Sequence, residues 1–249
     1  MRSFNRYFSA LRVVAGDACV PQTYQRVFRD GEALPTILIT DPPYLIFHSK
    51  REEKGMKRKR KLQDHPCVPR FESKKEYYKF TDAWFQLSQK HIAPNSPVII
   101  FTNPLGKGVI TEVLHTYGYN LYGEYIWGKK VDNKKNNVNE FWLRVNETAL
   151  VFTNPKTKLS EERLSRFTWS CVTNGEDSIH HEHPCYKPNS CLQPLLSQFL
   201  SQHDIVFDPF VGSGSILKAA QQLCNNRIYG IEILEEWADK ANDHLLAIK

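Results

Sequence analysis

Short apolar runs rich in β-branched residues alternate with longer amphipathic segments along the chain. Seven runs have the length and composition of strands, and they begin at Leu11, Thr36, Pro97, Asn120, Glu147, Asp204 and Arg227. The helical segments, in which apolar residues recur at three- and four-residue spacing, cover about 74–92, 106–117, 190–202, 214–224 and 234–247. Strands that alternate with helices predict a doubly wound α/β fold with a mainly parallel sheet. Because no helical segment separates the fourth run from the fifth, these two predict an antiparallel hairpin at one edge.

A chain of 249 residues with 41% hydrophobic residues can bury a substantial core, and we expect one domain over residues 1–249. No run of about 18 apolar residues occurs, so we expect no membrane span and no membrane partner. Two stretches fit neither pattern, residues 48–73 and 155–189. Long segments without regular structure are often functional, so we interpret the first as a basic insertion loop and the second as a short substrate-facing segment.

The six cysteines are scattered without a C-x-x-C pair, which indicates free thiols in an intracellular, reducing compartment. Histidines and cysteines gather between residues 171 and 191, but zinc ligands usually come in closely spaced pairs and this set is irregular, so we predict no metal site. The segment before Asp17 has three arginines, two serines and no acid, a composition typical of a transit peptide, although Leu11 to Val14 have the pattern of a strand. Nucleus, cytoplasm and mitochondrion stay open as locations.

The formal net charge of +6 comes from one segment. Residues Lys50 to Lys61 include eight basic and two acidic residues, and the rest of the chain carries 25 of each. A segment with a large excess of positive charge, in a protein that otherwise has equal numbers of basic and acidic residues, suits contact with a phosphate backbone. The alternatives are a solvated loop or a nuclear import signal. We favour contact with nucleic acid, because the segment begins six residues beyond Tyr44, where candidate chemistry lies.

The apolar run TILIT is followed by Asp41-Pro42-Pro43-Tyr44. Two consecutive prolines cannot continue a central strand, because each lacks a backbone N–H and has a fixed φ. The segment therefore leaves the predicted sheet as a stiff corner. This corner presents a carboxylate, backbone carbonyl groups that have no neighbouring N–H, and an aromatic ring. A strand-ending turn with a packed tyrosine is the alternative interpretation.

A second predicted strand ends at Asp208 and continues through Gly212-Ser213-Gly214 into a helical segment. Glycines let a ligand approach the backbone, and N–H groups at a helix N-terminus favour an anionic group. Glu232 ends the next strand, where an acid can bind both ribose hydroxyls of a nucleoside cofactor. A third glycine and a phosphate-binding lysine are missing, which disfavours NAD and ATP and favours a nucleoside ligand without phosphates.

These motifs resemble those of the S-adenosylmethionine-dependent amino-methyltransferases of nucleic acids. Asp208 to Gly214 match the family's cofactor motif D-P-F-x-G-S-G, and Asp41 to Tyr44 match its catalytic motif [DNS]-P-P-[YFW]. The catalytic motif comes first, as in the permuted beta group of N6-adenine and N4-cytosine DNA methyltransferases. Gly16 to Ala18 and His183 to Pro188 resemble that group's G-D-[CA] turn and H-P-x-x-K-P segment, and the runs EYIWGKK and RVNETALVFTN are also similar. The resemblance covers most of the chain in family order.

The resemblance implies a Rossmann-like methyltransferase fold with a seven-stranded, mainly parallel sheet, an antiparallel edge hairpin and a circularly permuted motif order. It implies S-adenosyl-L-methionine as the cofactor. The residues expected to bind it are Asp17, Ala18, Asp41, His183, Lys187, Pro188, Asp208, Pro209, Phe210, Gly212, Ser213, Gly214 and Glu232. The residues expected to carry catalysis are Asp41, Pro42, Pro43 and Tyr44.

In this scheme the Asp41 carboxylate and the Pro42 carbonyl accept hydrogen bonds from an exocyclic amine, whose lone pair is otherwise delocalised into its ring. Tyr44 stacks on a base taken out of its helix or single strand. Asp41 need not act as a strong base, so we do not predict a raised pKa.

An aspartate in this motif favours N6 of adenine, with N4 of cytosine as the runner-up. A non-catalytic subunit of a methyltransferase complex is a third hypothesis, although the chain retains both motifs. A protein-glutamine methyltransferase is disfavoured, because that family uses Asn-Pro-Pro-Tyr and the opposite motif order.

The expected partner is nucleic acid, with DNA favoured over RNA. The interval from Asn154 to Glu182 has only about thirty residues, too few for an independent target-recognition domain. Three alternatives follow: sequence-specific recognition is loose, it depends on a homodimer or a partner subunit, or it is replaced by recognition of a structured RNA. The residues expected to contact nucleic acid are Lys50, Arg51, Lys54, Lys57, Arg58, Lys59, Arg60, Lys61, Lys129, Lys130, Lys134 and Lys135.

Neutralising the basic residues from Lys57 to Lys61 is expected to weaken nucleic-acid binding. The slope of the logarithm of the affinity against the logarithm of the salt concentration should flatten by about 0.9 for each duplex phosphate contact that is lost. Fluorescence anisotropy titrations at several salt concentrations measure this slope. An unchanged slope would leave the solvated loop and the import signal as the interpretations of this segment.

Overall fold

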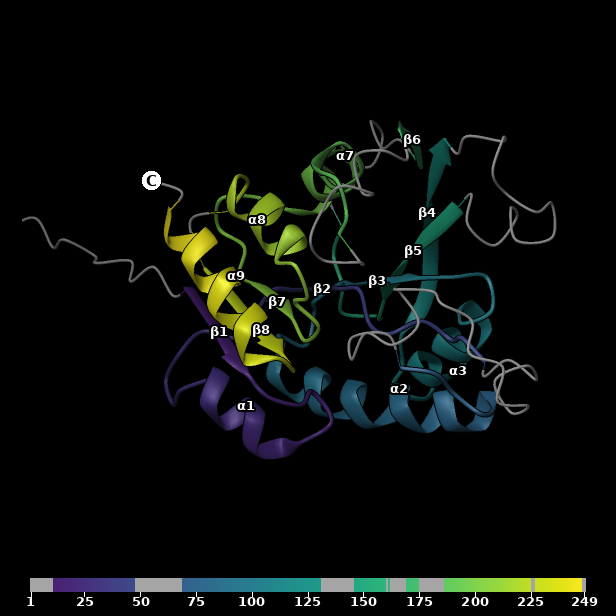
Figure 1. The fold of residues 1–249 in the computed structure, drawn as a ribbon, viewed down its shortest axis with the longest axis horizontal. Helices are drawn as coiled ribbons and strands as arrows, with labels where there is room; N and C mark the ends of the chain where they lie inside the picture. The colour runs from purple at the N-terminus through teal and green to yellow at the C-terminus, as the bar shows by residue number, and fades with distance from the viewer. Residues whose placement is uncertain are drawn as a thin grey trace, which may run out of the picture.

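The computed structural model describes residues 11–47, 69–130, 146–159, 161, 169–174, 186–224 and 227–247. These residues form one eight-stranded sheet with helices on both of its faces (Figure 1). The strand order is β1-β8-β7-β2-β3-β5-β4-β6. The predicted α/β class with a mainly parallel sheet is confirmed.

The strands are β1 (Leu11–Ala15), β2 (Ile37–Thr40), β3 (Val98–Thr102), β4 (Asn120–Lys130), β5 (Asn146–Thr153), β6 (Ser170–Asn174), β7 (Val206–Asp208) and β8 (Ile228–Glu232). β5 is antiparallel to both of its neighbours, β3 and β4, and every other pair is parallel. The central strands β2 and β3 are buried along their whole length, as expected of strands covered on both faces.

The helices are α1 (Pro21–Val27), α2 (Lys74–Ser88), α3 (Lys107–Thr116), α7 (Asn189–Phe199), α8 (Ser215–Gln221) and α9 (Glu235–Ala247), and a 3-10 turn, η1 (Gln89–His91), follows α2. α1, α2 and α3 cover one face of the sheet, and α7, α8 and α9 cover the other (Figure 1). Side chains alternate along the strands: Ile37 and Ile39 of β2 belong to the core under α7, and Leu38 belongs to the core under α2. Each face therefore has its own apolar core.

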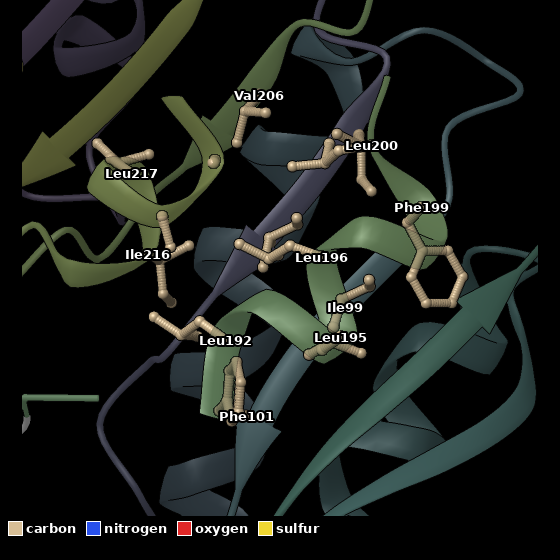
Figure 2. Packing of buried hydrophobic residues seen from close by; sticks show 14 of the residues in the cluster. Ile99, Phe101, Leu192, Leu195, Leu196, Phe199, Leu200, Val206, Ile216 and Leu217 are labelled. Atoms are coloured by element: carbon tan, nitrogen blue, oxygen red, sulfur yellow. The ribbon is translucent and has the colours of Figure 1, made fainter. Parts of the chain in front are cut away.

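The helix α7 is anchored by leucines at three- and four-residue spacing. Leu192, Leu195 and Leu196 are fully buried and point toward the apolar side chains of β3 (Figure 2). This spacing places them on one face of the helix, as the sequence pattern predicts. Their packing fixes the start of α7 and the segment Lys187-Pro188 that immediately precedes it.

The prediction of seven strands needs correction. An eighth strand, β6, lies inside the stretch 155–189 that we expected to be irregular, and it pairs in parallel with β4. The run SCVTN is too short to show a clear period, and it is ordered by the free edge of the 11-residue strand β4. The β4–β5 hairpin consequently lies one strand inward from the edge of the sheet. Residues 48–68 of the predicted basic insertion lie outside the described residues.

The strand order changes direction between β2 and β7. From β2 the chain continues to β3 on one side, whereas β7 is followed by β8 on the other side. In open parallel sheets, ligands bind at the carboxyl ends of the strands at such a switch point. Asp41 follows β2 and Asp208 ends β7, so the two aspartates that the sequence motifs single out flank this point.

Among the described helices, none combines the length and the apolar character of a transbilayer segment.

Gly230 of β8 lets the loop after β7 and the helix α8 pack closely on the sheet. A Cβ atom at this position would lie 2.4 Å from Val211 Cγ2 and 3.1 Å from Leu217 Cδ1, and both of those side chains are buried. We expect Gly230→Ala to lower the free energy of unfolding by about 1–3 kcal/mol, the usual cost of overpacking. Urea denaturation of the purified variant measures this loss.

Gly108→Ala in α3 is the matched control. A Cβ atom at Gly108 would have open space around it, and alanine is the better helix former, so this variant is expected to be neutral or stabilised by up to about 1 kcal/mol. An equal loss of stability in both variants would contradict the argument from close packing at Gly230.

Candidate active site

The segment after β2 is held by hydrogen bonds from neighbouring elements. Asn103, the residue after β3, donates from Nδ2 to the Leu45 carbonyl oxygen at 3.0 Å. The Phe71 backbone N–H donates to the Ile46 carbonyl oxygen at 2.9 Å. The proline corner is therefore fixed by β2 at its beginning and by two other parts of the chain at its end.

Asp41 forms a mostly buried ion pair with Lys187, which lies in the segment before α7. Lys187 Nζ is 2.7 Å from Asp41 Oδ2, and the two side chains are 3% and 12% exposed. The other carboxylate oxygen, Oδ1, is buried and has no hydrogen-bond partner among the residues that the structure describes. A buried acceptor without a donor is costly. Asp41 Oδ1 is therefore a candidate acceptor for a bound group.

Glu147, the second residue of β5, connects Tyr44 to Lys187. The Tyr44 hydroxyl donates to Glu147 Oε2 at 2.7 Å, and Lys187 Nζ donates to the same oxygen at 2.9 Å and to the Tyr44 hydroxyl at 3.1 Å. Lys129 of β4 donates to the second oxygen, Glu147 Oε1. The orientation of the Tyr44 ring is thus set by a carboxylate from the opposite half of the sheet.

The titration of these groups is shifted by burial and by their mutual charges. Burial raises the pKa of Asp41, Lys187 partly offsets the rise, and Glu147 adds to it. We did not expect this rise from the sequence, which does not show how deeply the carboxyl is buried. Burial also raises the pKa of Tyr44 well above its usual value, so its hydroxyl stays protonated.

Glu147 and Lys187 stay charged despite their burial. Burial alone would raise the pKa of Glu147, but Lys187 and Lys129 outweigh it and lower the pKa to about 2. Burial alone would lower the pKa of Lys187, but Asp41 and Glu147 outweigh it and raise the pKa. When Asp41 is ionised, the cluster contains two carboxylates and two ammonium groups and is electrically neutral.

Asp208 places a second incompletely paired carboxylate at the switch point. Its Oδ1 accepts from the Thr40 hydroxyl at 2.7 Å and from the Phe210 backbone N–H at 2.9 Å. Its Oδ2 is buried without a partner among the described residues. Burial is the main cause that raises the pKa of Asp208 to about 7. A cationic donor bound beside Oδ2 would satisfy this oxygen and restore its charge.

Glu232 and the glycine turn lie beside Asp208. The Glu232 carboxylate accepts from the backbone N–H groups of Gly212 at 2.7 Å and Leu234 at 3.0 Å. Gly212 and Gly214 have φ values of 53° and 75°, in the left-handed region that favours glycine. The Gly16 N–H donates to the Glu232 carbonyl at 2.8 Å, so the adjoining Asp17-Ala18 turn reaches the same edge. These predicted cofactor residues are brought together.

Other predicted residues are placed differently or lie outside the described part of the chain. The Phe210 ring packs against Trp84 and Phe80 of α2, with ring centroids 5.4 and 5.8 Å apart. The Lys129 ammonium is bound by Glu147, so its contact with phosphate stays a prediction. Lys130 ends β4. The predicted site residues outside the described ranges are Lys50, Arg51, Lys54, Lys57, Arg58, Lys59, Arg60, Lys61, Lys134, Lys135 and His183.

Glu147 is the site residue that the sequence motifs did not single out. Its only signal is an acid near the start of a strand, just before the apolar residues ALVF in the run NETALVFT. The metal interpretation is not tested, because the histidines between residues 171 and 191 lie outside the described residues; within the described ranges, no three His, Cys, Asp or Glu side chains are grouped so that they could hold an ion.

Comparison with known proteins identifies relatives along most of the chain. A family model described as DNA methylase, N6_N4_Mtase, matches residues 36–243. The type II methyltransferase M.HinfI of Haemophilus influenzae is 27% identical over 195 residues, which cover 70% of this chain and 53% of M.HinfI. The orphan methyltransferase M.BamHII of Bacillus amyloliquefaciens is 38% identical over 96 residues, 36% of each chain. The matches thus span less than two thirds of these relatives, whereas the match to M2.DpnII of Streptococcus pneumoniae, at 22% identity, covers 82% of that protein.

Solved structures share the fold at low identity. The M1.HpyAVI–SAM complex has a TM-score of 0.63 and 20% identity, and the match covers 93% of this chain and 98% of that one. The PvuII DNA methyltransferase, cytosine-N4-specific, has a TM-score of 0.65 and 15% identity, with 94% and 85% covered. At such identities the likeness establishes the fold, which is the methyltransferase fold that the sequence motifs predict.

Asp208→Asn tests the buried carboxylate in the ligand-free protein. The folded-state pKa of about 7 lies above the ordinary value of 3.8, so the wild type loses stability as the pH rises from about 4 to about 7. The asparagine variant has no such carboxyl group to titrate. We expect its free energy of unfolding to rise relative to the wild type by about 2–3 kcal/mol between pH 5 and pH 8. Urea denaturation at several pH values measures the difference, and parallel curves would show that Asp208 titrates normally.

Proposed function

Because the chain belongs to the N6_N4_Mtase family of DNA methylases, we propose that it transfers a methyl group from S-adenosyl-L-methionine to an exocyclic amino group of a base in DNA. The observation that carries this proposal is Asp41 at the switch point, with one oxygen paired to Lys187 and the other buried without a donor among the described residues. N6 of adenine is the proposed target atom, with N4 of cytosine as the second candidate.

The residues at the carboxyl ends of β7 and β8 suit the proposed cofactor. Asp208 Oδ2, a buried acceptor without a described partner, would bind the ammonium group of its methionine part. The Glu232 carboxylate ends β8 at the same edge, where the Gly212 and Leu234 N–H groups fix its orientation, and it would accept from the ribose hydroxyls. The Asp17-Ala18 turn would adjoin the adenine ring. When bound, S-adenosyl-L-methionine supplies an activated methyl group on a sulfonium.

The proline corner would prepare the amine for attack. Asp41 Oδ1 accepts one amino hydrogen and the Pro42 carbonyl oxygen accepts the other, which favours a pyramidal nitrogen with a localised lone pair. Methylation places positive charge on this nitrogen, and the two oxygens stabilise the charge as it develops. Its surplus proton can then pass to Asp41 Oδ1, where the raised pKa of the carboxyl helps to hold it before release to water. Tyr44 would stack on the base.

The choice of adenine rests on the aspartate at the head of the corner. Asp-Pro-Pro-Tyr resembles the N6-adenine enzymes more than the N4-cytosine enzymes, where serine is commoner. The fold does not separate the two, because the similar PvuII structure is that of a cytosine-N4-specific enzyme. A non-catalytic subunit is disfavoured, because the chain keeps both the catalytic corner and the cofactor turn.

DNA is the proposed substrate polymer, with RNA as the alternative. The basic segment Lys50 to Lys61 and the lysines Lys130, Lys134 and Lys135 would contact phosphates, whereas Lys129 is paired with Glu147. A second subunit would contribute to target recognition. The curated relatives named above are bacterial proteins. The nuclear and mitochondrial locations considered from sequence composition gain no support from them.

Incubation with methyl-labelled S-adenosyl-L-methionine and separate DNA and RNA pools tests the function. We expect label in DNA and, by mass spectrometry of the nucleosides, N6-methyladenine. N4-methylcytosine would support the second candidate, and label confined to RNA would replace DNA as the substrate. Cofactor binding without any transfer would support the non-catalytic subunit.

Asp41→Ala is expected to lower turnover by at least about 100-fold, because the amine loses its acceptor and the charge-stabilising carboxylate. Affinity for S-adenosyl-L-methionine, measured by calorimetry, should stay within a few fold. Asp41→Asn keeps the volume but lacks the charge, so it should be similarly inactive. Retention of activity in both variants would refute the role assigned to this carboxylate.

A further inference from the structure

Glu147 has no part in the chemistry described above, yet it contacts two groups that do. We propose that Glu147 is a positioning residue, which holds Lys187 on one oxygen of Asp41 and thereby keeps the other oxygen open for the target amine. Its second effect is to fix the ring of Tyr44 in the orientation needed for stacking. The inference rests on the proposed function, since the amine is the substrate of that reaction.

The donor count at Lys187 supports this role. A lysine ammonium has three N–H donors and no acceptor. Lys187 Nζ has three oxygen partners among the described residues: Asp41 Oδ2 at 2.7 Å, Glu147 Oε2 at 2.9 Å and the Tyr44 hydroxyl at 3.1 Å. Each donor therefore has one acceptor, and the Lys187 side chain is 3% exposed. No N–H group is left over for Asp41 Oδ1.

The surroundings of the ammonium favour this single position. Lys187 Nζ lies 4.7 Å from the centroid of the Phe101 ring and 5.5 Å from the centroids of the Trp127 and Tyr44 rings. These rings attract a cation through their faces but offer no hydrogen-bond acceptor. The three oxygens consequently decide where the N–H groups point.

Removal of the Glu147 carboxylate would change the pairing of Asp41. One buried N–H of Lys187 would lose its charged acceptor, and the unpaired oxygen of its remaining ion-pair partner among the described groups is Asp41 Oδ1. A lysine side chain is flexible enough to move onto it. Lys187 would then occupy both oxygens of Asp41, and the amine would have to displace a charged donor.

Lys129 completes the arrangement. It donates to Glu147 Oε1 and lies 4.2 Å from the centroid of the Trp127 ring. By occupying Oε1, it leaves Oε2 for Lys187 and Tyr44. Its charge also balances that of Glu147, so the positioning carboxylate adds no net charge to the pocket that receives a neutral base.

Glu147→Gln is the test variant, because it keeps the volume and removes the charge. We expect kcat to fall about 10- to 100-fold, as in other cases of a misplaced catalytic group, while KM for DNA and the Kd for S-adenosyl-L-methionine stay within about 3-fold. Tyr44→Phe, which removes one hydroxyl from the same cluster, should lower kcat less. The double variant should lower kcat by less than the product of the two single effects, because both changes break the Tyr44–Glu147 contact.

Glu124→Gln is the matched control. Glu124 lies on the neighbouring strand β4 and pairs with Lys107 of α3, and its side chain is 32% exposed. This variant removes one ion-paired carboxylate from the same hairpin but should leave kcat and the other constants unchanged.

A second measurement does not depend on activity. Removal of the negative charge of Glu147, together with tighter pairing to Lys187, should lower the pKa of Asp41 in Glu147→Gln and leave it unchanged in Glu124→Gln. Carbon-13 NMR of the aspartate carboxyl groups follows this titration, and Asp41→Asn identifies the signal. Among the described residues, the charged and titratable groups that face Asp41 are Lys187, Glu147, Tyr44, Asp208 and Tyr77.

The two proposals fail in different ways. A wild-type protein that transfers no methyl group would overturn the proposed function, and an unchanged Asp41 pKa in Glu147→Gln would still count against the positioning role of Glu147. An active wild type with unchanged kcat and an unchanged Asp41 pKa in Glu147→Gln would overturn the positioning role alone. An equal fall of kcat in Glu124→Gln would also overturn it, because the effect would then be general to the hairpin.

Discussion

One buried ammonium group joins the parts of the chain on which the site depends. Lys187 lies before α7, and its three acceptors come from the corner after β2 and from β5. The backbone around it is fixed by the leucines of α7 in one apolar core, and the corner is fixed by Asn103 beyond β3. A buried charge is tolerated only with such complete pairing. Any displacement of these elements therefore leaves either a charge or a carboxylate unpaired.

The fold and the two strand ends of the candidate site could be predicted because local patterns encode them. Alternation of apolar runs with amphipathic segments specifies a layered sheet, and prolines or glycines after a strand mark where the backbone leaves it. The resemblance added the order of the motifs, and with it the expectation that Asp41 and Asp208 meet. The sheet brings them together because β2 and β7 are neighbours, although 168 residues separate Thr40 from Asp208.

The remaining features depend on contacts that a linear pattern does not record. Glu147 looks like an ordinary acid at the start of a strand until β5 pairs beside β4. Lys129 lies in a basic run that predicts contact with phosphate, yet its ammonium group forms an ion pair with Glu147. β6 has only five residues and forms on the edge of a longer strand. The raised pKa of Asp41 follows from burial, which composition does not reveal.

The reversed direction of β5 has a consequence for how such a site can change over evolutionary time. Thr148 pairs with Thr102 at the end of β3, and Glu147 pairs with Trp127 near the end of β4. The beginning of β5 therefore reaches the edge at which the parallel strands finish. A side chain placed there is held by the sheet itself, whereas the other site residues lie on loops or at strand ends. The sequences of loops that contact a target can change while Glu147 keeps its position in the sheet. Substrate preference can therefore change without a change in the geometry at Asp41.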